Sequence, residues 1–164
     1  MKQISEEQFL QLFEDNQGII YKICYLYGKT EVDKQDLFQE ISIQLWKAYP
    51  TYKGTAKFTT WMYRVALNTA ITFFRKGKKK RQEIELKPEI TSGLVYAEYD
   101  DETERKLKNM YKAIGNLNAI EKALVFLYLE GKPYTEISDT LGISSVNARV
   151  KMNRIKIKLR EMLT

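Results

Sequence analysis

The sequence of 164 residues contains no histidine, one cysteine and three prolines. Without histidine, Ser-His-Asp triads, histidine general bases and most transition-metal sites are excluded. The single cysteine, Cys24, can form neither an intrachain disulfide nor a cysteine-based metal site, and its neighbours Ile23 and Leu26 indicate a buried structural thiol. We therefore expect no catalytic residue, no bound metal and no cofactor.

Long apolar runs are also missing. No stretch approaches the ~20 apolar residues that span a membrane, and the N-terminal segment has no apolar signal core. We expect a cytoplasmic protein that is not itself embedded in a membrane. With 44% hydrophobic and 29% charged residues, the composition is that of a folded globular protein. Lys and Arg outnumber Asp and Glu by 27 to 21, and the net charge of +6 favours a polyanionic partner.

Glycine and proline are scarce, and apolar residues recur at helical spacing along most of the chain. Ser5, followed by two glutamates, is a start signal for a first helix that Gly18 is expected to interrupt. Asp33 or Asp36 is expected to cap a later helix, which ends before Pro50 because the residue preceding proline disfavours helical geometry.

The middle of the chain consists of a helical segment, a basic run and a segment without helical periodicity. A long helix is expected over residues 58–75, followed by a nearly all-basic run that ends at residue 81. In residues 82–102 the helical periodicity disappears and acidic residues gather at the end, which is typical of a flexible linker. The sequence thus predicts an all-α protein of two small helical domains, residues 1–81 and 103–164, joined by this linker.

The C-terminal domain has the pattern of a helix-turn-helix. A short helix over residues 135–141 precedes Gly142, which supplies the turn, and Ser144 or Ser145 then caps the last helix. In that last helix apolar residues recur at spacings of four and three and form one stripe toward the core. The stripe consists of Ala148, Met152, Ile155, Leu159 and Met162.

Donor side chains crowd the other faces of the last helix. Early residues of such a helix read base edges in the major groove, whereas later cations meet phosphates. The alternative is a solvated basic face that only complements the helix dipole, but the turn and cap before it favour DNA reading. Val146, Val150 and Ile157 also point away from the stripe, so we expect some contacts of this face to be apolar, for example with thymine methyl groups. The predicted contacts are Ser145, Asn147, Arg149, Lys151, Asn153 and Arg154.

Residues 36–40 place Asp36, Gln39 and Glu40 on the helix face opposite the apolar residues. On spacing alone these side chains are the solvated side of an amphipathic helix. Together with Trp46, however, the segment resembles the sigma-factor family, in which this helix grips the clamp coiled coil of the largest RNA polymerase subunits. The resemblance implies that Asp36, Gln39 and Glu40 bind core RNA polymerase.

Two further segments resemble the small, extracytoplasmic-function (ECF) group of sigma factors. Residues 52–68 with Arg75 are similar to its promoter-melting segment, and residues 134–154 are similar to its domain that reads the minus-thirty-five element. Aromatic and cationic side chains together suit the capture of an unpaired strand. By resemblance, the loop 52–57 and Asn68 form a pocket for a base of the minus-ten element. The basic run 75–81 then lies along the DNA backbone. The implied minus-ten contacts are Tyr52, Lys53, Lys57, Asn68, Arg75 and Lys76.

The resemblance implies a sigma factor, not an enzyme, with core RNA polymerase and promoter DNA as partners and an anti-sigma factor as a further one. Val150 and Lys151 replace a small polar residue and an arginine that are frequent in the family, so the promoter sequence cannot be carried over. A stand-alone operator-binding regulator would explain the helix-turn-helix equally well, but it leaves Asp36, Gln39 and Glu40 unexplained. A nuclease would need clustered carboxylates for metal ions, whereas the acidic residues are spread along the chain.

Overall fold

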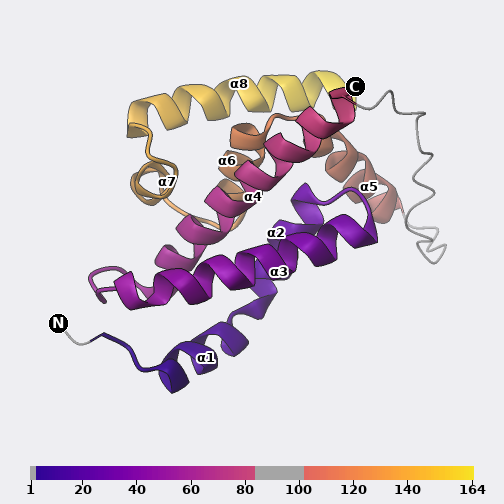
Figure 1. Ribbon diagram of the computed structural model, residues 1–164. Helices are drawn as coiled ribbons and strands as arrows, with labels where there is room; N and C mark the ends of the chain where they lie inside the picture. Colours follow the sequence, from indigo (N-terminus) through magenta and orange to yellow (C-terminus); the bar gives the residue numbers. More distant parts are fainter. Residues whose placement is uncertain (1–2, 84–101) are drawn as a thin grey trace.

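The computed structural model describes residues 3–83 and 102–164, and for residues 78–83 it describes the helix but not the side chains. Within these ranges every regular element is helical, so the all-α prediction is confirmed (Figure 1). The elements are α1 (Glu6–Asp15), α2 (Gln17–Tyr27), α3 (Glu31–Ala48), the short 3-10 helix η1 (Tyr49–Thr51), α4 (Phe58–Glu83), α5 (Glu102–Gly115), α6 (Ala119–Leu129), α7 (Tyr134–Leu141) and α8 (Ser145–Leu163).

Helix starts follow local capping chemistry. At α1 the Ser5 hydroxyl accepts the amide of Gln8, and the Gln8 side chain accepts the amide of Ser5. The start of α3 differs from the prediction, because Thr30 is the cap and accepts the Asp33 amide at 3.0 Å. Asp33 and Asp36 therefore lie inside the helix, and Asp33 in its first turn complements the helix dipole.

Two other predicted boundaries move. The first break falls at Asn16, so Gly18 lies inside α2. Helix α4 continues past Gly77 to Glu83 and takes in the basic run that was expected to follow it; a single glycine costs a helix only about 1 kcal/mol. Most of the predicted linker, residues 82–102, falls outside the described residues.

In the N-terminal half, α2, α3 and α4 pack against one another. Leu37 and Ile41 of α3 are fully buried, as their spacing predicts. Phe9 of α1 is buried against these helices, and its ring stacks on that of Tyr49 at a centroid separation of 4.8 Å. Cys24 is buried, and burial raises the pKa of its thiol to about 11, which confirms a structural rather than a reactive thiol.

The C-terminal half consists of α5 to α8, with α6 at its centre: residues 122–127 of α6 are all buried. The helix-turn-helix of α7 and α8 forms as predicted. Gly142 adopts the left-handed conformation, with φ of 70°, and its amide donates to the Ser138 carbonyl at 2.8 Å. Of the two candidate caps, Ser144 is the one that accepts the amide of Asn147, at 3.1 Å.

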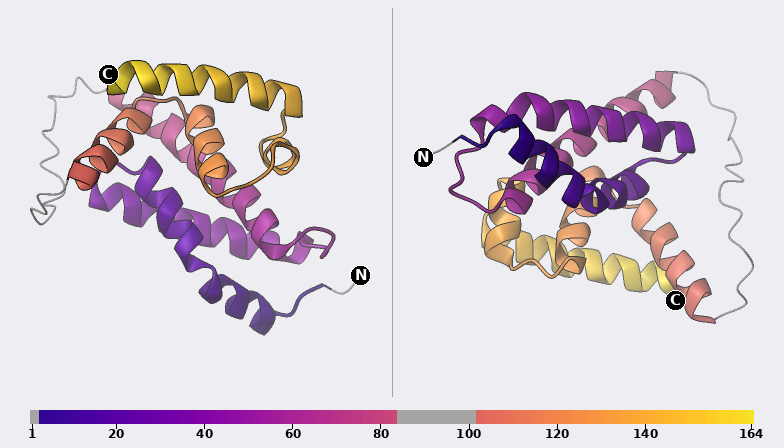
Figure 2. Two further views of the ribbon diagram at one scale, coloured as in Figure 1. Left: turned by 180° about the vertical axis from the view of Figure 1, so that it is seen from behind. Right: turned by 90° about the horizontal axis from the view of Figure 1, so that it is seen from below.

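The two halves pack against each other in a compact arrangement. Helix α4 lies between α2 and α3 on one side and α6 to α8 on the other, as seen in Figure 1 and from behind in Figure 2. Buried residues of both halves belong to one continuous hydrophobic cluster. At its centre the Tyr27 hydroxyl donates a buried 2.6 Å hydrogen bond to the carbonyl of Ala119. Burial raises the pKa of Tyr27 far above its ordinary value, so the phenol remains a donor.

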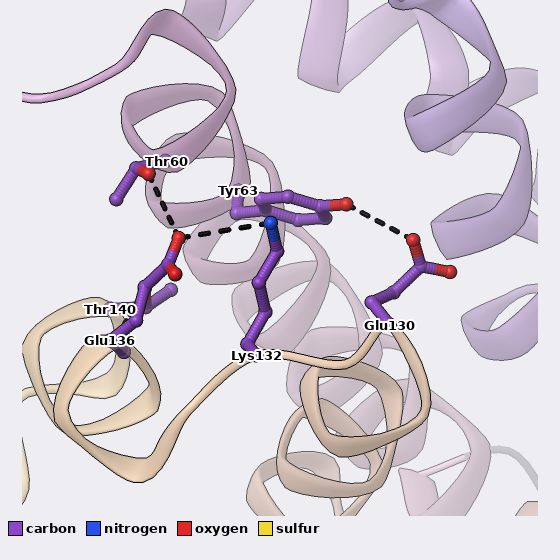
Figure 3. A network of polar contacts seen from close by, with 6 residues as sticks. All are labelled: Thr60, Tyr63, Glu130, Lys132, Glu136 and Thr140. Carbon is purple, nitrogen blue, oxygen red and sulfur yellow. Dashed lines mark hydrogen bonds and ion pairs between the residues drawn. The ribbon is translucent and has the colours of Figure 1, made fainter.

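An interdomain polar network (Thr60, Tyr63, Glu130, Lys132 and Glu136) orients the halves (Figure 3). The Thr60 hydroxyl donates to Glu136 at 2.9 Å, and Lys132 lies 3.9 Å from the same carboxylate. The Tyr63 hydroxyl donates to Glu130 at 3.1 Å, and the Lys132 ammonium lies 5.2 Å from the Tyr63 ring centroid. Hydrogen bonds of this geometry are directional, so the compact arrangement is specific and not a loose contact of apolar faces.

Candidate functional site

The acidic and amide side chains of α3 lie where the spacing predicts, on its outer face. Asp36 and Gln39 are exposed, and Glu40 is half-buried. The Glu40 carboxylate accepts a hydrogen bond from the Gln44 amide at 3.0 Å, which holds it along the helix surface. Trp46, one turn and a half further on, is 43% exposed although its ring lies 5.9 Å from that of Phe9. The face is therefore accessible to a basic partner.

The loop 52–57 before α4 is held by an aromatic and a polar contact. The Tyr52 hydroxyl donates to the carbonyl of Ala56 at 2.6 Å, and its ring packs 5.3 Å from that of Trp61. Lys53 and Lys57 are exposed. The loop thus presents two cations beside an aromatic cluster, which are the side chains that a single strand requires.

Asn68 lies apart from that loop. It lines an open pocket of about 530 Å³ between α3 and α4, together with Glu40, Gln44 and Lys76. Since α4 begins at Phe58 and a helix rises about 1.5 Å per residue, Asn68 is about 15 Å further along the axis. The structure brings Asn68 and Lys76 together with Glu40, but it does not bring Asn68 to the loop with which it was expected to form a base pocket.

The exposed surface of α8 divides into two flanks and an outer strip. At about 100° per residue, Arg149, Lys156 and Arg160 form one flank, which we call the outer flank. Arg149 is exposed, and its guanidinium lies 5.4 Å from the ring centroid of Tyr134 in α7. The strip beside it carries Asn153 with exposed Val146, Val150 and Ile157. Arg149 and Asn153 thus face outward together with apolar groups.

The other flank of α8, the inner flank, carries Asn147, Lys151, Arg154 and Lys158. Three of these cations, Lys151, Arg154 and Lys158, line a pocket of about 460 Å³ into which Arg75 of α4 also projects. The predicted minus-thirty-five contacts are therefore split between two surfaces. Lys151 and Arg154 share a pocket with a predicted minus-ten contact in this compact arrangement.

The apolar stripe of α8 is shorter than expected. Ala148, Met152, Ile155 and Leu159 are buried, but Met162 is 44% exposed. At about 100° per residue Met162 falls about 50° from the centre of the stripe. Its side chain therefore lies at the edge of the packed face.

The surroundings of two lysines of the C-terminal half were not predicted, although Lys158 was expected off the apolar stripe. Lys158 donates to Glu121 at 2.9 Å and belongs to the inner flank, which its spacing of four and seven from Arg154 and Lys151 could have indicated. Lys122 is only 2% exposed, and its ammonium lies 4.3 Å from the Phe74 ring centroid across the boundary between the halves. No periodicity could have indicated the burial of Lys122, since it depends on α4.

Within residues 3–83 and 102–164, no helix is long and apolar enough to cross a membrane. The same residues hold no group of cysteine and carboxylate side chains placed to bind a metal ion.

Two segments of the chain match known protein families. Residues 12–80 match Sigma-70 region 2, and residues 107–159 match Sigma-70, region 4. The first match takes in α3 and most of α4, and the second takes in the helix-turn-helix.

Curated relatives and solved structures agree with these matches. The chain is 24% identical to the ECF RNA polymerase sigma factor SigX of Bacillus subtilis, over 96% of this chain and 84% of that protein. It is also 24% identical to SigW of the same organism, over 99% and 92%. The sigma factor RpoE in its complex with the anti-sigma factor NepR from Bartonella quintana has a similar fold, with a TM-score of 0.77, 16% identity and coverage of 96% and 97%. CnrH in complex with the cytosolic domain of CnrY gives a TM-score of 0.67 at 18% identity, over 97% and 89%.

Proposed function

Because the chain belongs to the ECF-type group of the sigma-70 family, we propose that α3, α4 and α8 each carry one part of the function of this family. The family directs promoter-specific initiation by RNA polymerase and is not enzymatic. The observation that carries the division is that three different elements of the chain each present exposed polar side chains. The outer face of α3, the loop before α4 and the outer flank of α8 each present accessible polar side chains.

We propose that Asp36, Gln39 and Glu40 bind core RNA polymerase at its clamp coiled coil. Exposed carboxylates gain charge-assisted hydrogen bonds from basic side chains of a partner, and they also steer association. The buried apolar residues on the opposite face fix α3 in place, so the docking side chains are presented by a rigid helix. A protein that binds this enzyme and chromosomal DNA would act in the cytoplasm.

For the minus-ten element, the proposed contacts are those of the loop 52–57 and of α4. Tyr52 would offer a stacking surface, and Lys53, Lys57, Arg75 and Lys76 would contact phosphates. A base pocket shared with Asn68 requires the loop 52–57 to move along α4 when polymerase and DNA bind. Capturing one flipped base would offset the few kcal/mol that unstacking requires.

For the minus-thirty-five element, the proposed reading surface is the start of α8. Ser145, Asn147 and Arg149 lie in its first turn and a half, the part of a recognition helix that reaches base edges. Arg149 is the strongest candidate for a specific contact because its packing on Tyr134 orders the guanidinium before DNA binds. Lys151, Asn153 and Arg154 extend this surface along the groove.

Replacing Arg149 by alanine is expected to weaken holoenzyme binding to the promoter about tenfold through the upstream element. Loss of one good base contact removes roughly 1–3 kcal/mol of discrimination. The measurement is the affinity of reconstituted holoenzyme for a mapped promoter fragment, with and without a scrambled minus-thirty-five element. On the scrambled fragment the variant and the wild type should bind equally.

The matched control is Lys106→Ala, which also removes one positive charge from the C-terminal half. Lys106 lies on α5, and its side chain is 77% exposed. It should change promoter affinity by less than twofold. An equal loss in both variants, or a loss of core polymerase binding by Arg149→Ala, would contradict the assignment of Arg149.

We also propose that an anti-sigma factor binds this chain in its compact arrangement. Two solved structures with a similar fold support this proposal. RpoE is in complex with the anti-sigma factor NepR in one of them, and CnrH is in complex with the cytosolic domain of CnrY in the other. On a promoter the two halves would have to separate, because Lys151 and Arg154 face α4 in the compact arrangement.

A further inference from the structure

The 460 Å³ pocket between the halves is built from three elements that are distant in the sequence. Helix α4 supplies Phe74 and Arg75, the start of α6 supplies residues 118–121, and the inner flank of α8 supplies its three cations. Its volume lies within the range of small-molecule sites, roughly 300–1,000 Å³. The pocket exists only while α4 and α8 are held together, so a ligand bound there would report on the arrangement of the halves.

Positive charge in this pocket is poorly compensated. Among its described lining residues, Glu121 is the only acid beside Arg75, Lys151, Arg154 and Lys158. Burial alone would raise the pKa of the Glu121 carboxyl, but the hydrogen bond from Lys158, the backbone hydrogen bond at the N-cap and the charges of Lys158 and Lys151 hold that pKa below its ordinary value. Glu121 is therefore ionised and bound to Lys158, at 2.9 Å. Three cations remain without a matching acid in the pocket.

The remaining surfaces of the pocket also suit an anion. Helix α6 begins at Ala119, so the positive end of its dipole is directed at the pocket. Phe74 and Ile120 supply apolar surface beside the cations. Like charges brought together in a half-enclosed space repel each other more strongly than in open water, and a multivalent anion would remove this repulsion.

We propose that the pocket binds a polyphosphate, a chain of linked phosphates that is either free or attached to a nucleoside, which bridges Arg75 of α4 to Lys151 and Arg154 of α8. A chain fits better than a single phosphate because the cations come from different helices and carry several charges. Arginine forks and lysine ammonium groups are the usual partners of phosphate oxygens. The bound anion stabilises the compact arrangement.

A polyphosphate in this pocket competes with promoter DNA, an inference that rests on the function proposed above. Arg75, Lys151 and Arg154, which would bind the polyphosphate, are also proposed DNA contacts. It would hold the free protein compact until polymerase and promoter displace it.

The test is calorimetric titration of the full chain with inorganic tripolyphosphate, without magnesium, at near-physiological salt. One saturable site is expected. Arg154→Ala and Arg75→Ala, one on each half, should each weaken binding about tenfold or more, because charge-assisted hydrogen bonds to phosphate are lost. Arg149→Ala is the matched control, since it removes the same charge from the outer flank of α8, and it should change the affinity by less than twofold.

A second variant keeps the inference testable if alanine substitutions disturb the docking. Arg75→Glu places a carboxylate among the cations of α8, so it should abolish tripolyphosphate binding while small-angle X-ray scattering shows an unchanged compact particle. Absence of saturable binding to the wild type, or an equal loss with Arg149→Ala, would overturn the site. Neither result bears on the sigma function, because polymerase is not in the assay.

Further titrations identify the source of the phosphates. ATP binding more tightly than tripolyphosphate would support a nucleoside polyphosphate, and equal or weaker binding would support a free chain. Orthophosphate binding as tightly as tripolyphosphate would overturn the preference for a chain of phosphates, since the additional phosphates would then gain no contact with the cations.

Discussion

The double charge reversal Asp36→Lys with Glu40→Lys is expected to weaken binding to core RNA polymerase by at least a hundredfold, or about 3 kcal/mol. Each carboxylate would lose a charge-assisted hydrogen bond to a basic partner, and each new lysine would face positive charge at close range. The fold should survive, because Asp36 is exposed and Gln44, which donates a hydrogen bond to Glu40, lies on the same helix.

The measurement is the equilibrium affinity of labelled protein for core polymerase, with helix content checked by circular dichroism. Glu7→Lys with Glu14→Lys is the matched control: it reverses two exposed acidic charges on α1, and it should leave the affinity within about twofold at physiological salt. Wild-type affinity in the Asp36→Lys, Glu40→Lys variant would reject α3 as the docking helix, whereas an equal loss in the control would reduce the effect to net charge.

Replacing Lys122 by methionine is expected to raise the free energy of unfolding by about 2 kcal/mol at pH 7. Burial, reinforced by the charge of Lys29, lowers the pKa of the Lys122 ammonium from 10.5 to about 8. The Lys122 ammonium donates to the Leu26 carbonyl at 3.5 Å and lies 4.3 Å from the ring centroid of Phe74 and 5.7 Å from that of Tyr27. Methionine keeps the length of the side chain and removes the charge.

The pH dependence of this effect has a defined sign. Between about pH 8 and pH 10.5 the unfolded chain binds more protons at Lys122 than the folded chain does, so the destabilisation caused by this lysine decreases as the pH rises. The stability gap between Lys122→Met and wild type should therefore be largest below pH 8 and smaller at pH 9.5. Urea unfolding at pH 7 and pH 9.5 measures it.

Lys112→Met serves as the control for this pair, because Lys112 is an exposed lysine of α5. It should change stability by less than about 0.5 kcal/mol, with no dependence on pH. A gap between Lys122→Met and wild type that stays constant from pH 7 to pH 9.5 would contradict the buried, partly desolvated ammonium.

Local rules predict most of the helices. Gly142 ends α7 as expected, because its left-handed conformation acts on the backbone beside it. Helix α3 also ends before Pro50 as expected, but Tyr49 keeps right-handed helical geometry and the chain continues as η1. Thr30 was missed as the cap of α3 because Asp33 and Asp36 offer the same chemistry a few residues later. The length of α4 could not be predicted from Gly77, since its weak penalty is outweighed by neighbours that favour helix.

The docking of the halves could not be read from the sequence. The hydrogen bond from Tyr27 to Ala119 joins residues 92 positions apart, and helical spacing contains no information on such pairs. Helical spacing predicted which side chains of α3 and most of those of α8 lie off the packed face, but it did not predict that Arg75 shares a pocket with Lys151 and Arg154. Faces follow from the period of one helix, and pockets depend on the packing of several.

Transcription in vitro tests the central claim most directly. Core polymerase is incubated with genomic DNA from the source organism, with and without this protein, and transcript starts are mapped. We predict discrete new starts that share two upstream motifs and that disappear with the Asp36→Lys, Glu40→Lys variant. No new starts, with a core enzyme that responds to another sigma factor, together with sequence-specific duplex binding in the absence of polymerase, would contradict the assignment and indicate an operator-binding regulator.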